Sequence, residues 1–135
     1  MKKFQIFLVV FLSALYPSLG NAAALWNCRS DLTGSSAFQR YINVQYAFWS
    51  GEFESVTINY RGDGKLAFAR AGELAELEDG GRQITYEGWP GAALDVRIYI
   101  MSASIFDREA TTGALIERRM TNSATTEVVY NCSRN

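Results

Sequence analysis

Residues 38–49 read Phe-Gln-Arg-Tyr-Ile-Asn-Val-Gln-Tyr-Ala-Phe-Trp, and this stretch decides the fold class. Its even-numbered positions are apolar apart from Arg40, whereas its odd-numbered positions are mainly polar. Side chains of a β-strand alternate between the two faces of a sheet, so a period of two predicts a long, half-buried strand and not a helix. Ser50-Gly51-Glu52 then indicates a turn, and a second alternating segment runs from Val56 to Tyr60.

The same alternation recurs along the rest of the chain between short glycine-containing turns. These turns are Arg61-Gly62-Asp63-Gly64, Asp79-Gly80-Gly81 and Pro90-Gly91. Further strands are expected around Leu66 and Phe68, around Ile84 and Tyr86, and over 94–100, 114–121 and 125–132, whereas 73–78 suits a short helical turn as well as a strand. In 94–100, we expect Leu94, Val96, Ile98 and Ile100 on one face, with Asp95 and Arg97 on the other.

About eight strands with short connections favour antiparallel pairing between sequential strands. Such a sheet must protect its edges, either by closing on itself or by forming two layers. The sequence therefore predicts an all-β domain, a small antiparallel β-barrel, with a two-sheet β-sandwich as the alternative. Cys28 and Cys132 lie near the two ends of the chain. A disulfide between them would require the first and last strands to be neighbours, which favours the barrel.

The first residues have the pattern of a secretory signal peptide. Lys2 and Lys3 precede an apolar run over 6–12, and Ala22-Ala23-Ala24 offers small residues for cleavage. We expect residues 1–24 to be cleaved, leaving one β domain over 25–135 in the bacterial periplasm or outside the cell. The apolar run is shorter than a bilayer requires, so no membrane span is expected in the mature chain.

Composition narrows the possible functions. The chain has no histidine, which excludes histidine-based triads and imidazole metal ligands. Removal of residues 1–24 leaves a net charge of −3, because two of the 13 basic residues are lost and all 14 acidic residues remain. This charge argues against nucleic acid as a partner. The acidic residues of 73–79 do not have the spacing of a calcium-binding loop. We assign no catalytic residue, no metal site and no cofactor.

The tryptophans and their neighbours are the candidate binding residues. Trp49 and Trp89 each lie beside a turn, and we expect Trp49 to share the odd-numbered face with Tyr41, Asn43 and Gln45. Aromatic rings among amides can stack on and hydrogen-bond a polar ligand such as a glycan. The alternative is that both tryptophans simply cover the ends of the core.

The sequence thus predicts an exported binding protein without catalytic activity, whose unknown partner is a small polar ligand or an envelope protein. In architecture, a small exported barrel with cysteines at both ends resembles the periplasmic lysozyme inhibitors. Their Ser-Gly-x-x-Tyr loop is absent, so the resemblance transfers no functional residue. It implies an alternative function as an inhibitor or immunity-type partner of an envelope-acting enzyme such as a lysozyme, with a protruding loop at 51–53 or 107–113. A small carboxylate-based hydrolase is the third possibility.

Overall fold

The computed structural model describes residues 23–30, 39–60, 64–88 and 94–135. About two thirds of these residues lie in strands, which confirms the all-β class. The strands are β1 (Ala23–Ser30), β2 (Gln39–Tyr46), β3 (Phe53–Tyr60), β4 (Lys65–Arg70), β5 (Ala75–Glu76), β6 (Arg82–Glu87), β7 (Asp95–Met101), β8 (Thr112–Thr121) and β9 (Thr125–Arg134). Two short 3₁₀ helices, η1 (Ala71–Glu73) and η2 (Ala103–Phe106), lie in the connections. The ambiguous segment 73–78 contains both the end of a helical turn and the short strand β5.

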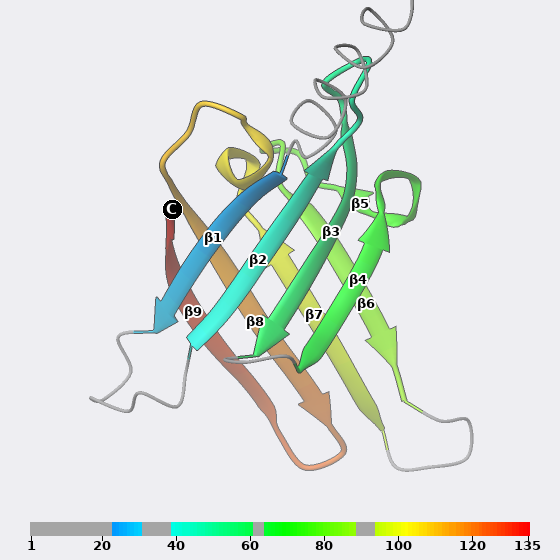
Figure 1. The fold of residues 1–135 in the computed structure, drawn as a ribbon. Coiled ribbons are helices and arrows are strands. Elements are labelled where there is room, and N and C mark those ends of the chain that lie inside the picture. Colours follow the sequence, from blue (N-terminus) through cyan, green and yellow to red (C-terminus); the bar gives the residue numbers. More distant parts are fainter. Residues whose placement is uncertain (1–22, 31–38, 61–63, 89–93) are drawn as a thin grey trace, which may run out of the picture.

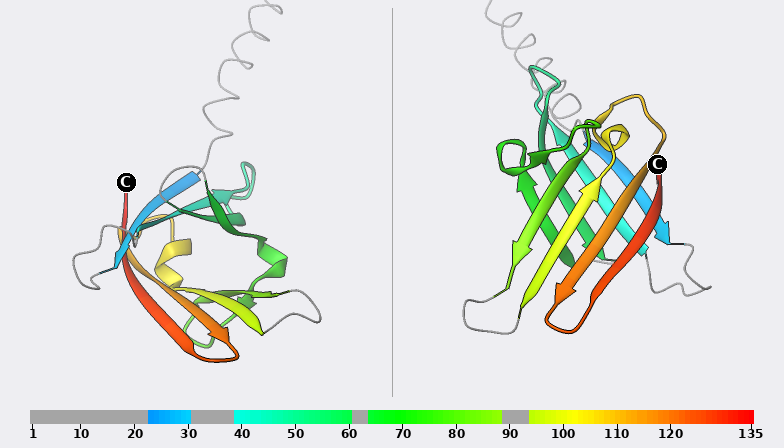
Figure 2. Two further views of the ribbon diagram at one scale, coloured as in Figure 1. Left: turned by 90° about the horizontal axis from the view of Figure 1, so that it is seen from below. Right: turned by 180° about the vertical axis from the view of Figure 1, so that it is seen from behind.

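All these strands belong to one antiparallel sheet, in the order β4-β3-β2-β1-β9-β8-β7-β6-β5. The sheet curls into a half-barrel, so the two-layer alternative is not formed (Figures 1 and 2). The first and last strands are neighbours, as the cysteines predicted. The two ends of the strand order are β4 and β5, which are consecutive in the chain. The open seam of the sheet therefore lies in the middle of the sequence, beside η1.

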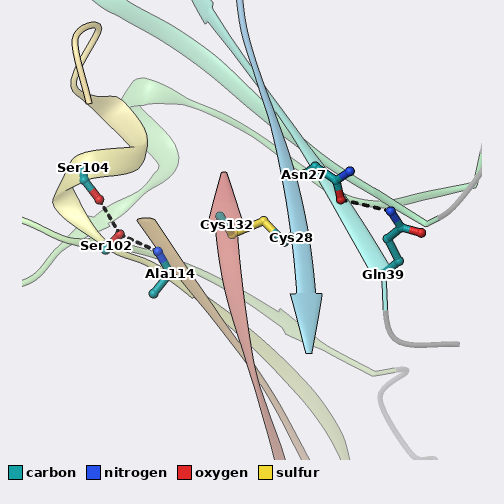
Figure 3. The surroundings of a disulfide bond; sticks show 7 residues. All are labelled: Asn27, Cys28, Gln39, Ser102, Ser104, Ala114 and Cys132. Atoms are coloured by element: carbon teal, nitrogen blue, oxygen red, sulfur yellow. Dashed lines mark hydrogen bonds between the residues drawn. A yellow bond between two sulfur atoms is a disulfide. The ribbon is translucent and has the colours of Figure 1, made fainter. Parts of the chain in front are cut away.

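A disulfide between Cys28 and Cys132 joins β1 to β9 (Figure 3). The two cysteines lie directly opposite each other in the strand register, with their Cα atoms 4.0 Å apart, and both are buried. This pairing is where the meander β1–β4 meets the meander β5–β9. The predicted disulfide is confirmed, and it fastens the two halves of the sheet to each other.

The core fills the concave side of the sheet. Its largest fully buried side chains are those of Trp26, Tyr99, Tyr130, Ile42, Ile58, Met101, Ile105 and Leu115. Ile105 belongs to η2, which lies inside the curve of the sheet in the end-on view (Figure 2). A side chain at Gly113 of β8 would collide with Ile105, since a Cβ atom there would lie 2.6 Å from its Cδ1. A larger residue at position 113 would therefore require the Ile105 side chain to shift where η2 packs against β8.

The inward faces of β7 and β4 do not carry their bulkiest aliphatic rows. In β7, Tyr99 and Met101 are fully buried, so the row of Val96, Ile98 and Ile100 faces outward, and it is half-buried. In β4 the small residues Ala67 and Ala69 point inward, and Phe68 points outward with 38% of its surface exposed. These alanines lie opposite the bulkier Ile58 and Val56 of β3, which already fill the core at this position.

Some of the predicted features lie outside the described residues, namely most of the signal peptide, the turns around 61–63 and 90–91, and Trp89. At its start, β1 already includes Ala24, which is buried and pairs with Val44. Cleavage after Ala22 would therefore leave β1 whole, whereas cleavage after Ala24 would remove its first two residues. Among the described residues, no helix has the length and apolar character needed to cross a membrane.

Candidate functional site

Three of the five predicted binding residues share one outward face. Tyr41, Asn43 and Gln45 alternate along β2 with buried residues and lie on the convex side of the sheet. Their amides are partly occupied with each other, because Gln45 Nε2 donates to Asn43 Oδ1 at 2.9 Å. Gln39 Nε2 likewise donates to Asn27 Oδ1 of β1 at 3.0 Å (Figure 3). The result is an outer wall of mutually bonded amides, separate from the core side of the sheet.

Trp49 does not lie on that face, because β2 ends at Tyr46. It stands instead in the connection between β2 and β3, residues 47–52, which we call the Trp49 hairpin. The loop is closed by hydrogen bonds from Ala47 N to Glu52 O and from Gly51 N to Ala47 O, both 2.8 Å. Gly51 has a φ of 68°, a conformation that favours glycine. The expected turn at 50–52 is thus present, and it removes Trp49 from the alternating strand.

The indole of Trp49 projects into solvent. Its relative exposure is 83%, the largest among the large hydrophobic residues that the structure describes. The neighbouring Phe48 ring packs against it, edge-on at a centroid distance of 4.6 Å. The hairpin extends beyond the end of the sheet in Figure 1. An aromatic side chain is therefore presented at the tip of a projecting loop.

The base of the Trp49 hairpin is firmly packed. Phe53 and Phe106 are in edge-to-face contact at 4.8 Å, and the Arg82 guanidinium lies 4.9 Å from both ring centroids. Tyr46 donates a hydrogen bond to the Phe106 carbonyl at 3.2 Å, and the Arg108 guanidinium lies 5.1 Å from the Tyr46 ring. Strands β2 and β3 are thereby held against η2, so the tip rests on a rigid support.

Acidic residues dominate the connections at this end of the sheet. Because the strands are antiparallel, segments 47–52, 71–81 and 102–111 all lie at the same end (Figure 1). Together these segments carry one basic residue, Arg108, against the carboxylates of Glu52, Glu73, Glu76, Glu78, Asp79, Asp107 and Glu109. We call this the hairpin end. It contains both places where the sequence predicted a protruding charged or aromatic loop.

A polar cluster lies on the inward face toward the opposite end, where β2 begins. Arg40 is only 7% exposed, and its Nε donates to Glu117 Oε2 of β8 at 2.9 Å. The Tyr60 and Tyr130 rings flank this guanidinium at 4.9 and 5.3 Å. Tyr130 also donates its hydroxyl hydrogen to Glu117 at 3.4 Å. Burial, and then the negative charge of Glu117, raise the pKa of Tyr130, so this phenol remains a hydrogen-bond donor.

One sign of this cluster was visible in the sequence, since Arg40 interrupts an otherwise apolar face. Glu117 could not be assigned as its partner, because the two residues lie on strands that are distant in sequence and not adjacent in the sheet. Glu117 faces a guanidinium and a phenol, which is the geometry of a structural ion pair.

Among the described residues there is no group of three or more His, Cys, Asp or Glu side chains placed to hold a metal ion.

The outer wall of β7, β8 and β9 is aliphatic, in contrast to the amide wall of β1 and β2. Ile116 of β8 lies between Ile100 of β7 and Val129 of β9 in the strand register, and Val96 pairs with Met120. Val129 is 49% exposed. The two halves of the convex surface thus differ in polarity. The difference arises because the aliphatic row of β7 points outward.

Comparison with known proteins returns no matching family model, no matching curated protein and no matching solved structure. The function is therefore argued from the geometry of the chain itself. Its two most distinctive features are the exposed Trp49 hairpin and the inward polar cluster at the other end.

Proposed function

We propose that this protein is an exported binding module that docks onto a basic protein partner through the Trp49 hairpin. The observation that carries the proposal is the 83% exposure of Trp49 at the tip of a projecting loop. Tryptophan is among the residues that contribute most to binding energy in protein interfaces, because it buries a large apolar surface and retains one hydrogen-bond donor. An indole held in solvent by a rigid loop is well suited to enter a cleft on a partner.

The packing of the hairpin supports this role. Binding costs free energy when loops and side chains must first be ordered. The hydrogen bonds that close the loop, the edge contact from Phe48 and the stacked base around Arg82 already order it in the unbound protein. A partner would therefore bind a preformed shape.

The charge around the hairpin indicates the chemistry of the partner. The connections of the hairpin end carry seven carboxylates and one arginine, so this end of the sheet has a net negative charge. Such a surface accelerates association with a positively charged protein and disfavours acidic ones. The resemblance to periplasmic lysozyme inhibitors makes an envelope-acting enzyme with a basic surface the first partner to test.

The other functions considered have less support from the geometry. The concave side of the sheet is filled by Trp26, Tyr99, Tyr130 and their aliphatic neighbours. The amide wall that was expected to bind a polar ligand is separated from Trp49. A carboxylate-based hydrolase would need two facing carboxylates, whereas Glu117 faces Arg40 and Tyr130.

Capture from an envelope extract tests the proposal. The oxidised protein, Trp49→Ala and Val129→Thr are immobilised, and the bound proteins are identified and quantified at several salt concentrations. Val129→Thr is the matched control, because it alters an exposed apolar side chain on the aliphatic wall. We expect a basic protein whose capture weakens with salt, is lost with Trp49→Ala and persists with Val129→Thr.

The proposal fails if Trp49→Ala captures the same protein equally well, or if no basic protein is captured in stoichiometric amount. Loss of capture with Val129→Thr alone would place the interface on the aliphatic wall instead. In parallel, a lysozyme is assayed directly for inhibition of cell-wall lysis. Inhibition by the native protein that disappears with Trp49→Ala would identify the class of enzyme.

A further inference from the structure

Two arginines face each other on the inward side of the sheet, at the end opposite the Trp49 hairpin. Arg97 of β7 and Arg119 of β8 are direct partners in the strand register. They share the face of Tyr99 and Glu117, which lie two residues away on the same strands. Like charges placed directly opposite each other destabilise a sheet. This pair therefore requires compensating negative charge.

The Asp95 carboxylate supplies part of that negative charge, and it lies closer to Arg119 than to Arg97. Asp95 accepts two hydrogen bonds from Arg119, from Nε at 3.1 Å and from Nη2 at 3.2 Å. Arg97 is more distant, with its Nε 3.8 Å from Asp95 Oδ1. Among the described residues, two guanidiniums thus share the Asp95 carboxylate, and Arg97 is the less well compensated of the two. Its side chain is 40% exposed, so a solute can reach it.

Tyr99 supplies a second sign of an absent acceptor. Its side chain is fully buried, and its hydroxyl has no hydrogen-bond partner of ordinary geometry among the described residues. Burial and the charge of Glu117 raise the pKa of this hydroxyl, whereas Arg97 lowers it by its charge and as a hydrogen-bond donor, so the hydroxyl still lacks an acceptor for its own hydrogen. Glu117 is already occupied by Arg40 and Tyr130. A buried polar group without a partner is costly, and such groups often mark a site for a missing ligand or water.

We propose that this end of the sheet binds a small oxyanion, the carboxylate or phosphate group of a small molecule, between Arg97 and Tyr99. The oxyanion would accept hydrogen bonds from the Arg97 guanidinium and from the Tyr99 hydroxyl. A guanidinium is suited to this role because its planar N–H groups match two oxygens of a carboxylate or phosphate. The site is separate from the Trp49 hairpin and does not depend on the function proposed for it.

Titration of the oxidised protein with inorganic phosphate, and separately with acetate, tests the site. Binding is followed by calorimetry and by NMR shifts, with chloride keeping the ionic strength constant. We expect saturable binding of at least one of the two anions at one site per chain. Tyr99→Phe should weaken it about ten-fold, the effect of losing one hydrogen bond to a charged group, and Arg97→Gln by at least as much.

Arg118→Gln is the matched control, since Arg118 lies on the outward face of β8 and pairs with Glu127 at 2.8 Å. It changes the net charge as Arg97→Gln does, and it should leave the affinity unchanged. Tyr99→Phe removes only a hydroxyl that has no acceptor among the described residues, so its thermal unfolding should be close to that of the native protein. Saturation by phosphate alone or by acetate alone would identify the anionic group. The proposal is overturned if neither anion saturates, or if Arg118→Gln weakens binding as much as Arg97→Gln.

Discussion

Tyr86 bridges the open seam of the sheet, and its replacement by phenylalanine tests how that seam is held. The Tyr86 hydroxyl on β6 accepts a hydrogen bond from Phe68 N of β4 and donates one to Phe68 O, both 2.8 Å. Strands β4 and β6 are not paired with each other. One phenol therefore satisfies both backbone groups of an edge residue, in the place where a neighbouring strand would do so.

The expected cost of Tyr86→Phe follows from these two bonds. A hydrogen bond contributes about 0.5–1.5 kcal/mol to stability, so two give roughly 1–3 kcal/mol. Tyr86 is 37% exposed and Phe68 38%, so water replaces part of this contribution in the variant. We expect the free energy of unfolding to fall by about 1 kcal/mol, near the lower limit. The edge contact between the Tyr86 and Tyr99 rings, with centroids 6.4 Å apart, would remain.

Urea denaturation measures the global effect, and amide hydrogen exchange at Phe68 measures the local one. A local loss of about 1 kcal/mol corresponds to roughly five-fold faster exchange through opening of the seam. Tyr41→Phe is the control, because Tyr41 lies on the outward face of β2, where its hydroxyl bonds to no other described residue. Equal losses in the two variants, or unchanged exchange at Phe68, would show that the seam is held by something other than this phenol.

Three further predictions concern the stability of the sheet. Replacing both cysteines by alanine should lower the free energy of unfolding in urea by up to about 4–5 kcal/mol, because the bridge spans 104 residues; a loss below about 1 kcal/mol would contradict this. Glu117→Gln should cost about 3 kcal/mol, since it leaves the buried Arg40 charge uncompensated, whereas Glu127→Gln on the surface should cost under about 1 kcal/mol. Burial raises the pKa of Tyr99 and Tyr130 above the ordinary value of 10.0, so stability should be complete below pH 10 and fall as the pH rises above it. Urea unfolding and phenolate absorbance between about pH 8 and 11.5 measure this fall, and a flat profile would refute it.

The fold class and the disulfide could be predicted because each depends on a strong local or chemical signal. Alternation with a period of two in 39–46 specifies a strand, and two cysteines near the chain ends of a small β domain have one possible pairing. Which face of β7 points inward could not be predicted, because the strand carries apolar residues on both of its faces. Tyr99 and Met101 compete there with Val96, Ile98 and Ile100, and only pairing with Glu117 and Leu115 decides between them.

The candidate site was only partly predictable, because its position depends on backbone geometry and on distant strands. Trp49 continues the alternation of β2 in the sequence, but the strand ends at Tyr46. The chain turns in the connection that follows, with a positive φ at Gly51, and a hydrophobic pattern carries no information about that dihedral angle. The inward cluster was visible only as Arg40, a single exception in an apolar face. Its partner Glu117 comes from a strand that only the curled sheet brings near.

The two proposed sites can be tested independently, because they lie at opposite ends of the sheet. A strand of eight residues such as β2 spans about 26 Å. Screening by salt at physiological ionic strength acts over about 8 Å, so a charge changed at one end has little effect at the other. Arg97→Gln should therefore leave the capture of a basic partner unchanged, and Trp49→Ala should leave phosphate or acetate binding unchanged. If either variant weakened both interactions, the effect would have to pass through the fold itself, and the assignment of separate sites would be wrong.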